Sequence, residues 1–111
     1  MAGVGRRLVE LLDRPEVLAA PGVPDALSAR LVAEAGFEAV YMSGDATTAV
    51  RLGMPDVGLL TMSEIVDNAG RIADAVDLPV IADADTGYGG PVNVRRTVRD
   101  YERAGVAAIQ M

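Results

Sequence analysis

Residues 79–90 read Pro-Val-Ile-Ala-Asp-Ala-Asp-Thr-Gly-Tyr-Gly-Gly, and this stretch decides the fold. Its first four residues are apolar and partly β-branched, which is typical of a strand buried on both faces of a parallel sheet. The Asp and Gly residues that follow favour a loop, and Pro91 suits the first turn of a helix. The stretch therefore predicts a strand at 79–82, a loop at 83–90 and a helix from Pro91 to Ala104.

Strand and helix patterns alternate on both sides of this stretch. Thr61 and Glu64 form a capping box before an apolar stripe at spacings of three and four, which predicts a helix to Val76. The other expected elements are helices at 6–13, 24–35 and near 47–52, within a polar loop at 45–60, and strands at 17–20, 37–42 and 106–111. Inward positions are expected at Leu27, Leu31 and Ala35 of the second helix, and at Val94, Val98 and Tyr101 of the last one.

An internal repeat supports this alternation, because residues 35–42 and 104–111 agree at four of eight positions. Strands that alternate with helices imply right-handed crossovers and a parallel sheet. Four such strands fit a small doubly wound sheet, and they equally fit half of a (β/α)₈ TIM barrel, which needs about 250 residues. The sequence stops at Met111 inside an apolar strand, without a turn or a polar tail. We therefore expect residues 1–111 to be the N-terminal half of one barrel domain, truncated at the fourth strand.

The composition restricts the class of protein. The net charge is −6, and the chain has neither cysteine nor histidine, which excludes disulfides, thiolate metal sites and histidine acid–base catalysis within it. Few aromatic residues and scattered arginines argue against a nucleic acid partner. The apolar runs are too short for a membrane span, and no signal-peptide pattern follows Arg6 and Arg7. We expect a cytoplasmic protein with no nucleic acid or membrane partner.

Asp83 and Asp85 are the sharpest local signal for chemistry. Two carboxylates on alternate residues at a strand end can share a hard cation such as Mg²⁺, which prefers oxygen ligands. The same pair fits an ordinary loop start, because Asp favours turns. The apolar strand before the pair favours a metal, since strand-end carboxylates in a cleft are costly without a partner.

Further candidates follow the ends of other predicted strands, where α/β enzymes place their sites. The backbone N–H groups of Ser43-Gly44-Asp45 could bind a carboxylate or an enolate oxygen, although an ordinary turn has the same sequence. Asp56 is a turn residue by default and a third acidic group by hypothesis. Tyr41 and Tyr88 are interpreted as packing residues unless their hydroxyls face the cleft.

Four segments, in this order, resemble the isocitrate lyase/phosphoenolpyruvate mutase superfamily. They are Pro21-Gly-Val-Pro-Asp-Ala-Leu-Ser-Ala-Arg30, Tyr41-Met-Ser-Gly44, Leu52-Gly-Met-Pro-Asp-Val-Gly58 and Leu78-Pro-Val-Ile-Ala-Asp-Ala-Asp-Thr-Gly-Tyr-Gly89. The resemblance runs from about Leu8 to Met111. It is strongest to the branch of methylisocitrate lyase, oxaloacetate decarboxylase and carboxyphosphonoenolpyruvate phosphonomutase.

The resemblance implies a (β/α)₈ barrel that uses Mg²⁺, or Mn²⁺ in its place, and acts on small carboxylates through a metal-chelated, pyruvate-like enolate. It implies metal-site roles for Asp83 and Asp85, catalytic-network roles for Asp56 and Tyr41, and substrate binding by the segment of Ser43, Gly44 and Asp45. Many lyases of the family have Ser-Gly-Gly at this segment. An Asp side chain at position 45 would repel a bound carboxylate unless it points away.

We therefore expect a carbon–carbon lyase or decarboxylase of small 2-oxo or 2-hydroxy carboxylic acids, forming a homo-oligomer, a tetramer by resemblance, when full length. One alternative is a phosphoenolpyruvate mutase-type enzyme that works on carbon–phosphorus bonds. Another is an inactive half-barrel that self-associates through open sheet edges. We expect no turnover from these 111 residues alone.

Overall fold

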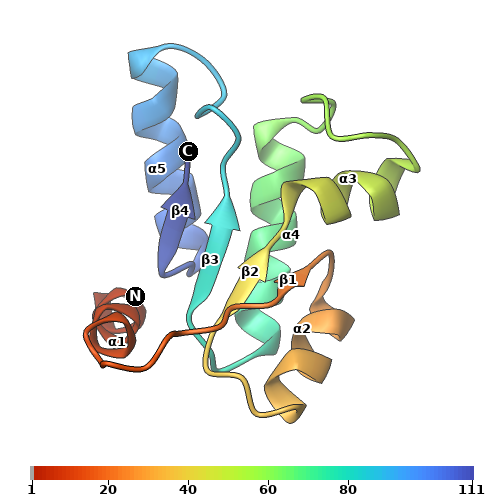
Figure 1. Cartoon of the computed structure of the whole chain (residues 1–111). Coiled ribbons are helices and arrows are strands. Elements are labelled where there is room, and N and C mark those ends of the chain that lie inside the picture. Colours follow the sequence, from red (N-terminus) through yellow and green to blue (C-terminus); the bar gives the residue numbers. More distant parts are fainter. Residues whose placement is uncertain (1) are drawn as a thin grey trace.

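The computed structural model describes residues 2–111 and contains one parallel sheet of four strands, in the order β1-β2-β3-β4 (Figure 1). The strands are β1 (Gly22–Val23), β2 (Val40–Met42), β3 (Val80–Asp83) and β4 (Ala108–Gln110). Val40 pairs with Val80, and Ile81 pairs with Ala108, all in parallel register. The sequential order and the parallel pairing predicted from the sequence are confirmed.

The position predicted for the first strand is wrong. Residues 17–20 form no strand, and Val17 is 96% exposed. The chain pairs with β2 only from Pro21 onward, where the Pro21 carbonyl accepts the Tyr41 N–H at 2.9 Å and the Val23 carbonyl accepts the Ser43 N–H at 3.1 Å. The apolar run at 17–20 is not a strand, because it has no neighbouring strand with which its backbone can pair.

Five helices join and flank the strands. They are α1 (Ala2–Leu12), α2 (Ala26–Glu34), α3 (Gly44–Leu52), α4 (Met62–Ala75) and α5 (Pro91–Ala104). The capping box of Thr61 and Glu64 is present at the start of α4, and Gly105 ends α5 in the left-handed conformation. The expected helix near 47–52 exists but begins three residues earlier, at Gly44, because the Ser43 side chain caps it. None of these helices is long and apolar enough to span a bilayer, within residues 2–111.

The two faces of the sheet differ in burial. Residues on alternate positions of the strands pack against the helices and are almost fully buried: Val23, Val40, Met42, Val80 and Ala82. Figure 1 shows α4 and α5 on that side of the sheet, with the other face toward the viewer. The open face carries the intervening residues Tyr41, Ile81, Asp83, Ala108 and Gln110, which are partly or fully exposed.

The inward stripe expected on α2 is wrong, since Leu27, Leu31 and Ala35 are all exposed, and the one expected on α5 is only partly right. Leu27 and Leu31 are 70% and 58% exposed, because α2 turns its small residue Ala29 toward the core instead. On α5, Tyr101 is fully buried as expected, whereas Val98 is 40% exposed. Helical spacing identifies a face, but neighbouring elements decide which face is covered.

Candidate active site

The carboxyl ends of the strands meet at a small pocket beside β3. Asp83 ends β3, Asp85 lies two residues further on, and Asp56 reaches the pocket from the loop between α3 and α4. The pocket has a volume of about 30 Å³ and is lined by Gly44, Thr48, Asp56, Gly58, Leu59, Leu60, Ile65, Asp83, Asp85 and Tyr88. The structure thus brings together the three acidic residues singled out in the sequence, in a space that holds a water-sized species.

A larger hollow, of about 270 Å³, lies elsewhere, between Gly5 of α1, α5 and β4. Its lining is mostly apolar, with Glu102 as the acidic group. Ligand sites combine an apolar wall with convergent polar groups, and those groups converge at the small pocket, not at the larger hollow.

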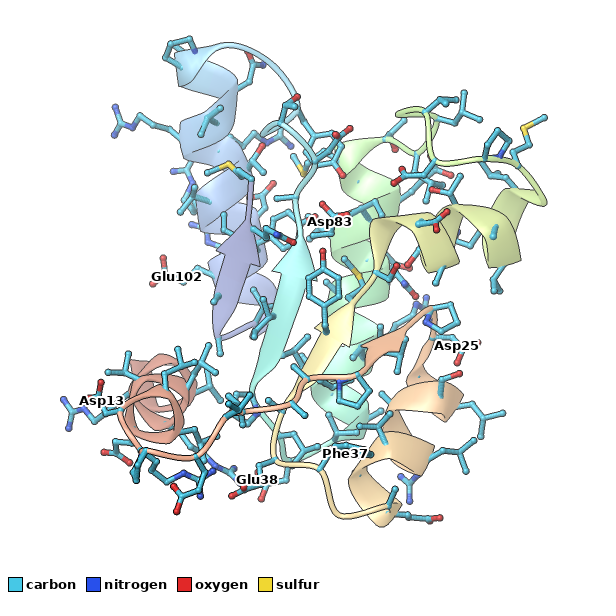
Figure 2. All side chains as sticks on the ribbon, in the orientation of Figure 1. Asp13, Asp25, Phe37, Glu38, Asp83 and Glu102 are labelled. Atoms are coloured by element: carbon cyan, nitrogen blue, oxygen red, sulfur yellow. The ribbon has the colours of Figure 1, made fainter. Side chains whose placement is uncertain are left out.

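The Asp83 side chain is held from two directions. Its Oδ2 atom accepts the Gly44 N–H at 3.2 Å, and its Oδ1 atom accepts the Asp85 N–H at 2.8 Å. A Cβ at position 44 would clash with Oδ2 and lie 3.0 Å from Cγ, so this approach requires glycine. Figure 2 shows Asp83 at the upper end of β3, beside the start of the helix that follows β2. The carboxylate therefore joins the β3 loop to the β2–α3 junction.

The predicted substrate segment, Ser43-Gly44-Asp45, forms the start of α3. Ser43 caps the helix, with its Oγ atom accepting the Ala46 N–H at 3.0 Å. Gly44 is buried and faces Asp83, whereas Asp45 is exposed and is not among the residues that line the pocket. A carboxylate in the first turn of a helix is favoured by the helix dipole. Asp45 therefore lies in solvent in the first turn of α3, outside the pocket.

Asp56 lies on an exposed loop but in a crowded electrostatic setting. Desolvation raises the pKa of the Asp56 carboxyl above its ordinary value, and the negative charges of Asp83, Asp45 and Asp85 raise it further. Like charges that approach one another favour the protonated form of one of them. A cation among these carboxylates would relieve the repulsion.

Tyr41 lies on the open face of the sheet, outside the set of pocket-lining residues. Its hydroxyl donates to Gln110 Oε1 at 2.6 Å, across β3. Burial, followed by the charges of Asp83 and Asp56, raises the pKa of the Tyr41 hydroxyl. Gln110 was not singled out in the sequence, yet it is the register partner of Asp83 at the end of β4.

Tyr88 and Tyr101 are two site residues whose roles the sequence did not reveal. The Tyr101 hydroxyl is fully buried and donates to the main-chain carbonyl of Asp83 at 2.8 Å. Tyr88 lines the pocket at a φ of 63°, and burial raises the pKa of its hydroxyl to about 12. Both hydroxyls therefore stay protonated at neutral pH, and that of Tyr101 is a donor to Asp83.

The side chains at the pocket fit a hard divalent cation. Asp56, Asp83 and Asp85 offer only oxygen ligands, and Mg²⁺ commonly binds one or two carboxylates while keeping several waters. Within residues 2–111, no three acidic side chains gather closely enough to form a direct ligand cluster. A cation bound by one or two of these carboxylates, with water as its other ligands, is compatible with this lining.

Comparison with known proteins identifies the family of the chain. Residues 8–111 match the family described as phosphoenolpyruvate phosphomutase. The 2,3-dimethylmalate lyase of Eubacterium barkeri is 54% identical over 105 residues, which cover 95% of this chain and 36% of that protein. The chain therefore spans about a third of the length of this curated relative.

Solved structures agree with the sequence match. An oxaloacetate acetylhydrolase in complex with the inhibitor 3,3-difluorooxalacetate is 48% identical, with a TM-score of 0.90 over 96% of this chain and 37% of that one. A phosphonopyruvate hydrolase in complex with oxalate and Mg²⁺ is 37% identical, again with a TM-score of 0.90, over 96% of this chain and 37% of that one. With its four parallel strands, its acidic pocket and these matches, the chain belongs to the phosphoenolpyruvate mutase/isocitrate lyase superfamily.

Proposed function

We propose that this chain is the N-terminal half of a (β/α)₈ barrel enzyme that cleaves carbon–carbon bonds in small 2-oxo or 2-hydroxy carboxylic acids with the help of Mg²⁺, or of Mn²⁺ in its place. The observation that carries the proposal is the pocket in which Asp56, Asp83 and Asp85 converge beside the N-terminus of α3. This grouping would join a cation site to an anion site, which is what a metal-bound carboxylate substrate needs.

Asp83 and Asp85 would hold the cation, and Asp56 would contact it through water. Bound there, Mg²⁺ supplies a Lewis acid beside the carbonyl group of the substrate. Asp83 is already oriented by two N–H donors, so little side-chain freedom remains to be lost on binding. A carboxylate that is oriented in this way supports a binding site whose geometry exists before the ligand binds.

The substrate carboxylate would lie against the N-terminus of α3, in the segment of Ser43, Gly44 and Asp45. The first N–H groups of a helix lack intrahelical acceptors and favour anions. Because the N–H groups of Gly44 and Ala46 already donate to Asp83 and Ser43, the N–H of Asp45 would be the one to meet the substrate carboxylate. Asp45 leaves this proposal intact because its side chain lies in solvent and outside the pocket. Tyr41 would face the substrate from the open side of the sheet, where its hydroxyl now bonds to Gln110.

A second candidate is a carbon–phosphorus enzyme on the same scaffold. It is favoured by the family match itself and by the 37% identity to a phosphonopyruvate hydrolase. Both candidates use the same metal pocket, so the difference between them lies in the bond that is cleaved.

The test is a chimera in which this chain replaces the matching 36% of the dimethylmalate lyase from Eubacterium barkeri. Purified chimera is assayed with a panel of small 2-oxo and 2-hydroxy acids and with phosphonopyruvate, with and without EDTA. Mg²⁺-dependent release of a 2-oxo acid by carbon–carbon cleavage supports the lyase, and phosphate release supports the second candidate. A folded chimera whose turnover is indifferent to EDTA refutes the metal role.

The 111-residue chain is assayed beside the chimera. We expect it to bind Mg²⁺ but to give no turnover, because its open sheet face leaves the substrate unsheltered from water. Robust turnover by the chain alone would contradict the half-barrel proposal.

A further inference from the structure

Three side chains of α5 hold the loop that carries Asp83 and Asp85. The Tyr101 hydroxyl donates to the Asp83 carbonyl at 2.8 Å. The Thr97 hydroxyl lies 2.8 Å from the Gly87 carbonyl and 3.0 Å from the Asn93 carbonyl of its own helix, and its one proton is shared between these two acceptors. Asn93 Oδ1 accepts the Gly90 N–H at 3.2 Å. We call Asn93, Thr97 and Tyr101 the α5 ladder.

The spacing of the ladder explains how one helix reaches the whole loop. Residues four apart lie on the same face of a helix, one above another. Position 101 bonds to residue 83, position 97 to residue 87 and position 93 to residue 90, so the loop runs alongside α5 in the opposite direction. Figure 1 shows this loop rising from the end of β3 to the start of α5. The loop is therefore fixed to α5 at its beginning by Tyr101 and at its middle by Thr97, whereas Asn93 caps the start of α5 itself at Gly90.

Burial and close packing show that these bonds are part of a built structure. Thr97 is 1% exposed and Tyr101 is fully buried. Gly87 has a φ of 96°, and a Cβ there would lie 2.7 Å from Val94 Cγ2, so the loop is pressed against the helix. Buried hydroxyls that meet main-chain carbonyls leave no polar group unsatisfied, and they fix the backbone they contact.

The loop also holds two residues other than glycine at positive φ, a region that Tyr rarely adopts and Asp adopts somewhat more often. Asp85 has a φ of 51° and Tyr88 has a φ of 63°. Such conformations persist only where the surrounding structure imposes them, and they gather at binding and active sites. Because Asp85 is one of these two residues, the direction of its side chain depends on how firmly the loop is held.

We propose that Thr97 and Tyr101 are positioning residues for the acidic pocket, which set where the Asp83 and Asp85 carboxylates lie without themselves touching metal or substrate. What the carboxylates bind rests on the proposed function, whereas their positioning is measurable without any metal. Groups that only orient metal ligands typically change metal affinity about 10-fold to 100-fold when removed. The ladder is therefore expected to act on cation affinity through the backbone of the loop.

The experiment compares Thr97→Val, which keeps the shape and removes the hydroxyl, with Thr97→Ser, which keeps the hydroxyl. Ile72→Val is the matched control, because Ile72 is fully buried on α4 and outside the ladder. Two quantities are measured on the 111-residue chain. They are the amide exchange rates of Asp85 and Gly87 relative to those of β3, without metal, and the dissociation constant of Mg²⁺ by titration calorimetry.

Thr97→Val should speed exchange at Asp85 and Gly87 by about fivefold, as expected for one lost hydrogen bond. It should weaken Mg²⁺ binding by about tenfold. Thr97→Ser should return both quantities toward wild type, and Ile72→Val should change neither. Tyr101→Phe is the second variant, should Thr97→Val fail to fold, and it should loosen the start of the loop in the same way.

The outcomes separate the two proposals. If folded Thr97→Val, or Tyr101→Phe in its place, exchanges and binds Mg²⁺ like wild type, the positioning role is overturned. Suppose that amide exchange accelerates in the ladder variants but wild type binds no Mg²⁺ at millimolar concentration. The positioning role of the ladder is then supported, and the proposed metal function is refuted. If Ile72→Val weakens Mg²⁺ binding as much as Thr97→Val, the effect is one of general stability and the positioning role is again overturned.

Discussion

The two loops that bring acidic residues to the pocket are built in opposite ways. The loop at 83–90 is bonded to α5 by three side chains, and its Gly87 is buried. The loop at 53–59 is exposed throughout, and its internal hydrogen bond joins the Val57 N–H to the Pro55 carbonyl at 3.0 Å. The loop of Asp83 and Asp85 is thus fixed by tertiary hydrogen bonds to α5. The loop of Asp56 is exposed to solvent and has few contacts that would restrict its motion.

The largest expected effect follows from removing a carboxylate from the loop at 83–90. Asp85→Ala should reduce turnover of the chimera by more than about 100-fold, the upper end for groups that merely support a metal ligand. The measurement is turnover against Mg²⁺ concentration, with circular dichroism to confirm folding. Asp67→Ala is the control, because Asp67 sits on the exposed side of α4 and pairs with Arg71. Near wild-type turnover and an unchanged Mg²⁺ requirement in Asp85→Ala would contradict the metal assignment.

The second prediction uses one glycine from each loop. Both Gly87 and Gly58 have positive φ, but a Cβ at Gly87 would lie 2.7 Å from Val94, whereas one at Gly58 would meet its nearest neighbour, Asp85 Oδ2, at 3.6 Å. Gly58→Ala should cost about 1 kcal/mol of unfolding free energy, from the left-handed conformation alone. Gly87→Ala should cost about 2–4 kcal/mol, because overpacking adds to that strain. Urea unfolding measures both, and equal losses would mean that the two loops are held alike.

The third prediction concerns the order in which the loops open. Segments with few buried contacts open at a low free energy, so subtilisin should cut the chain first within 53–59 and only later within 83–90. Mg²⁺ should slow the first cut if Asp56 joins the cation through water. Mass spectrometry of the early fragments identifies the cleavage site. An initial cut within 83–90 would show that this loop, and not the one at 53–59, opens more easily.

The smallest effect is electrostatic. The folded-state pKa of Asp56 lies above the ordinary 3.8. Its contribution to stability is therefore fully present below pH 3.8 and is lost as the pH rises through the raised pKa. Mg²⁺ should lower this pKa, and Asp56→Asn should remove its titration. Carbon-13 NMR of the Asp carboxyl groups follows both changes, and a pKa for Asp56 that Mg²⁺ leaves unmoved would exclude it from the cation's surroundings.

Much of the fold was predictable because its signals are local. The capping box at Thr61 and Glu64, the proline at the start of α5 and the apolar run at 79–82 each act within a few residues, and each prediction is confirmed. The first strand was misplaced because Gly22 and Val23 are strand residues only by virtue of their pairing with β2. A strand of two residues is too short to show the alternating pattern by which strands are recognised in a sequence.

The acidic residues of the candidate site could be picked out in the sequence, but the residues that hold them in position could not. Asp83 and Asp85 stand out because two acids follow an apolar strand. The contact between Gly44 and Asp83 spans 39 positions, and the bond from Tyr101 to Asp83 spans 18. Such contacts depend on how the strands align, which a sequence pattern does not encode. The spacing of Asn93, Thr97 and Tyr101 is visible in the sequence, but it acquires meaning only once the loop lies beside α5.

The strand order has a consequence for how the protein is made. Each strand pairs with the one that precedes it in the chain, so every βα unit leaving the ribosome meets a partner edge that has already been synthesised. The junction of β2 and α3 can form early, yet the Gly44 N–H receives its carboxylate only when Asp83 emerges, 39 residues later. Slow codons between Gly44 and Asp83 would therefore prolong a state in which part of the sheet has formed but the pocket has not.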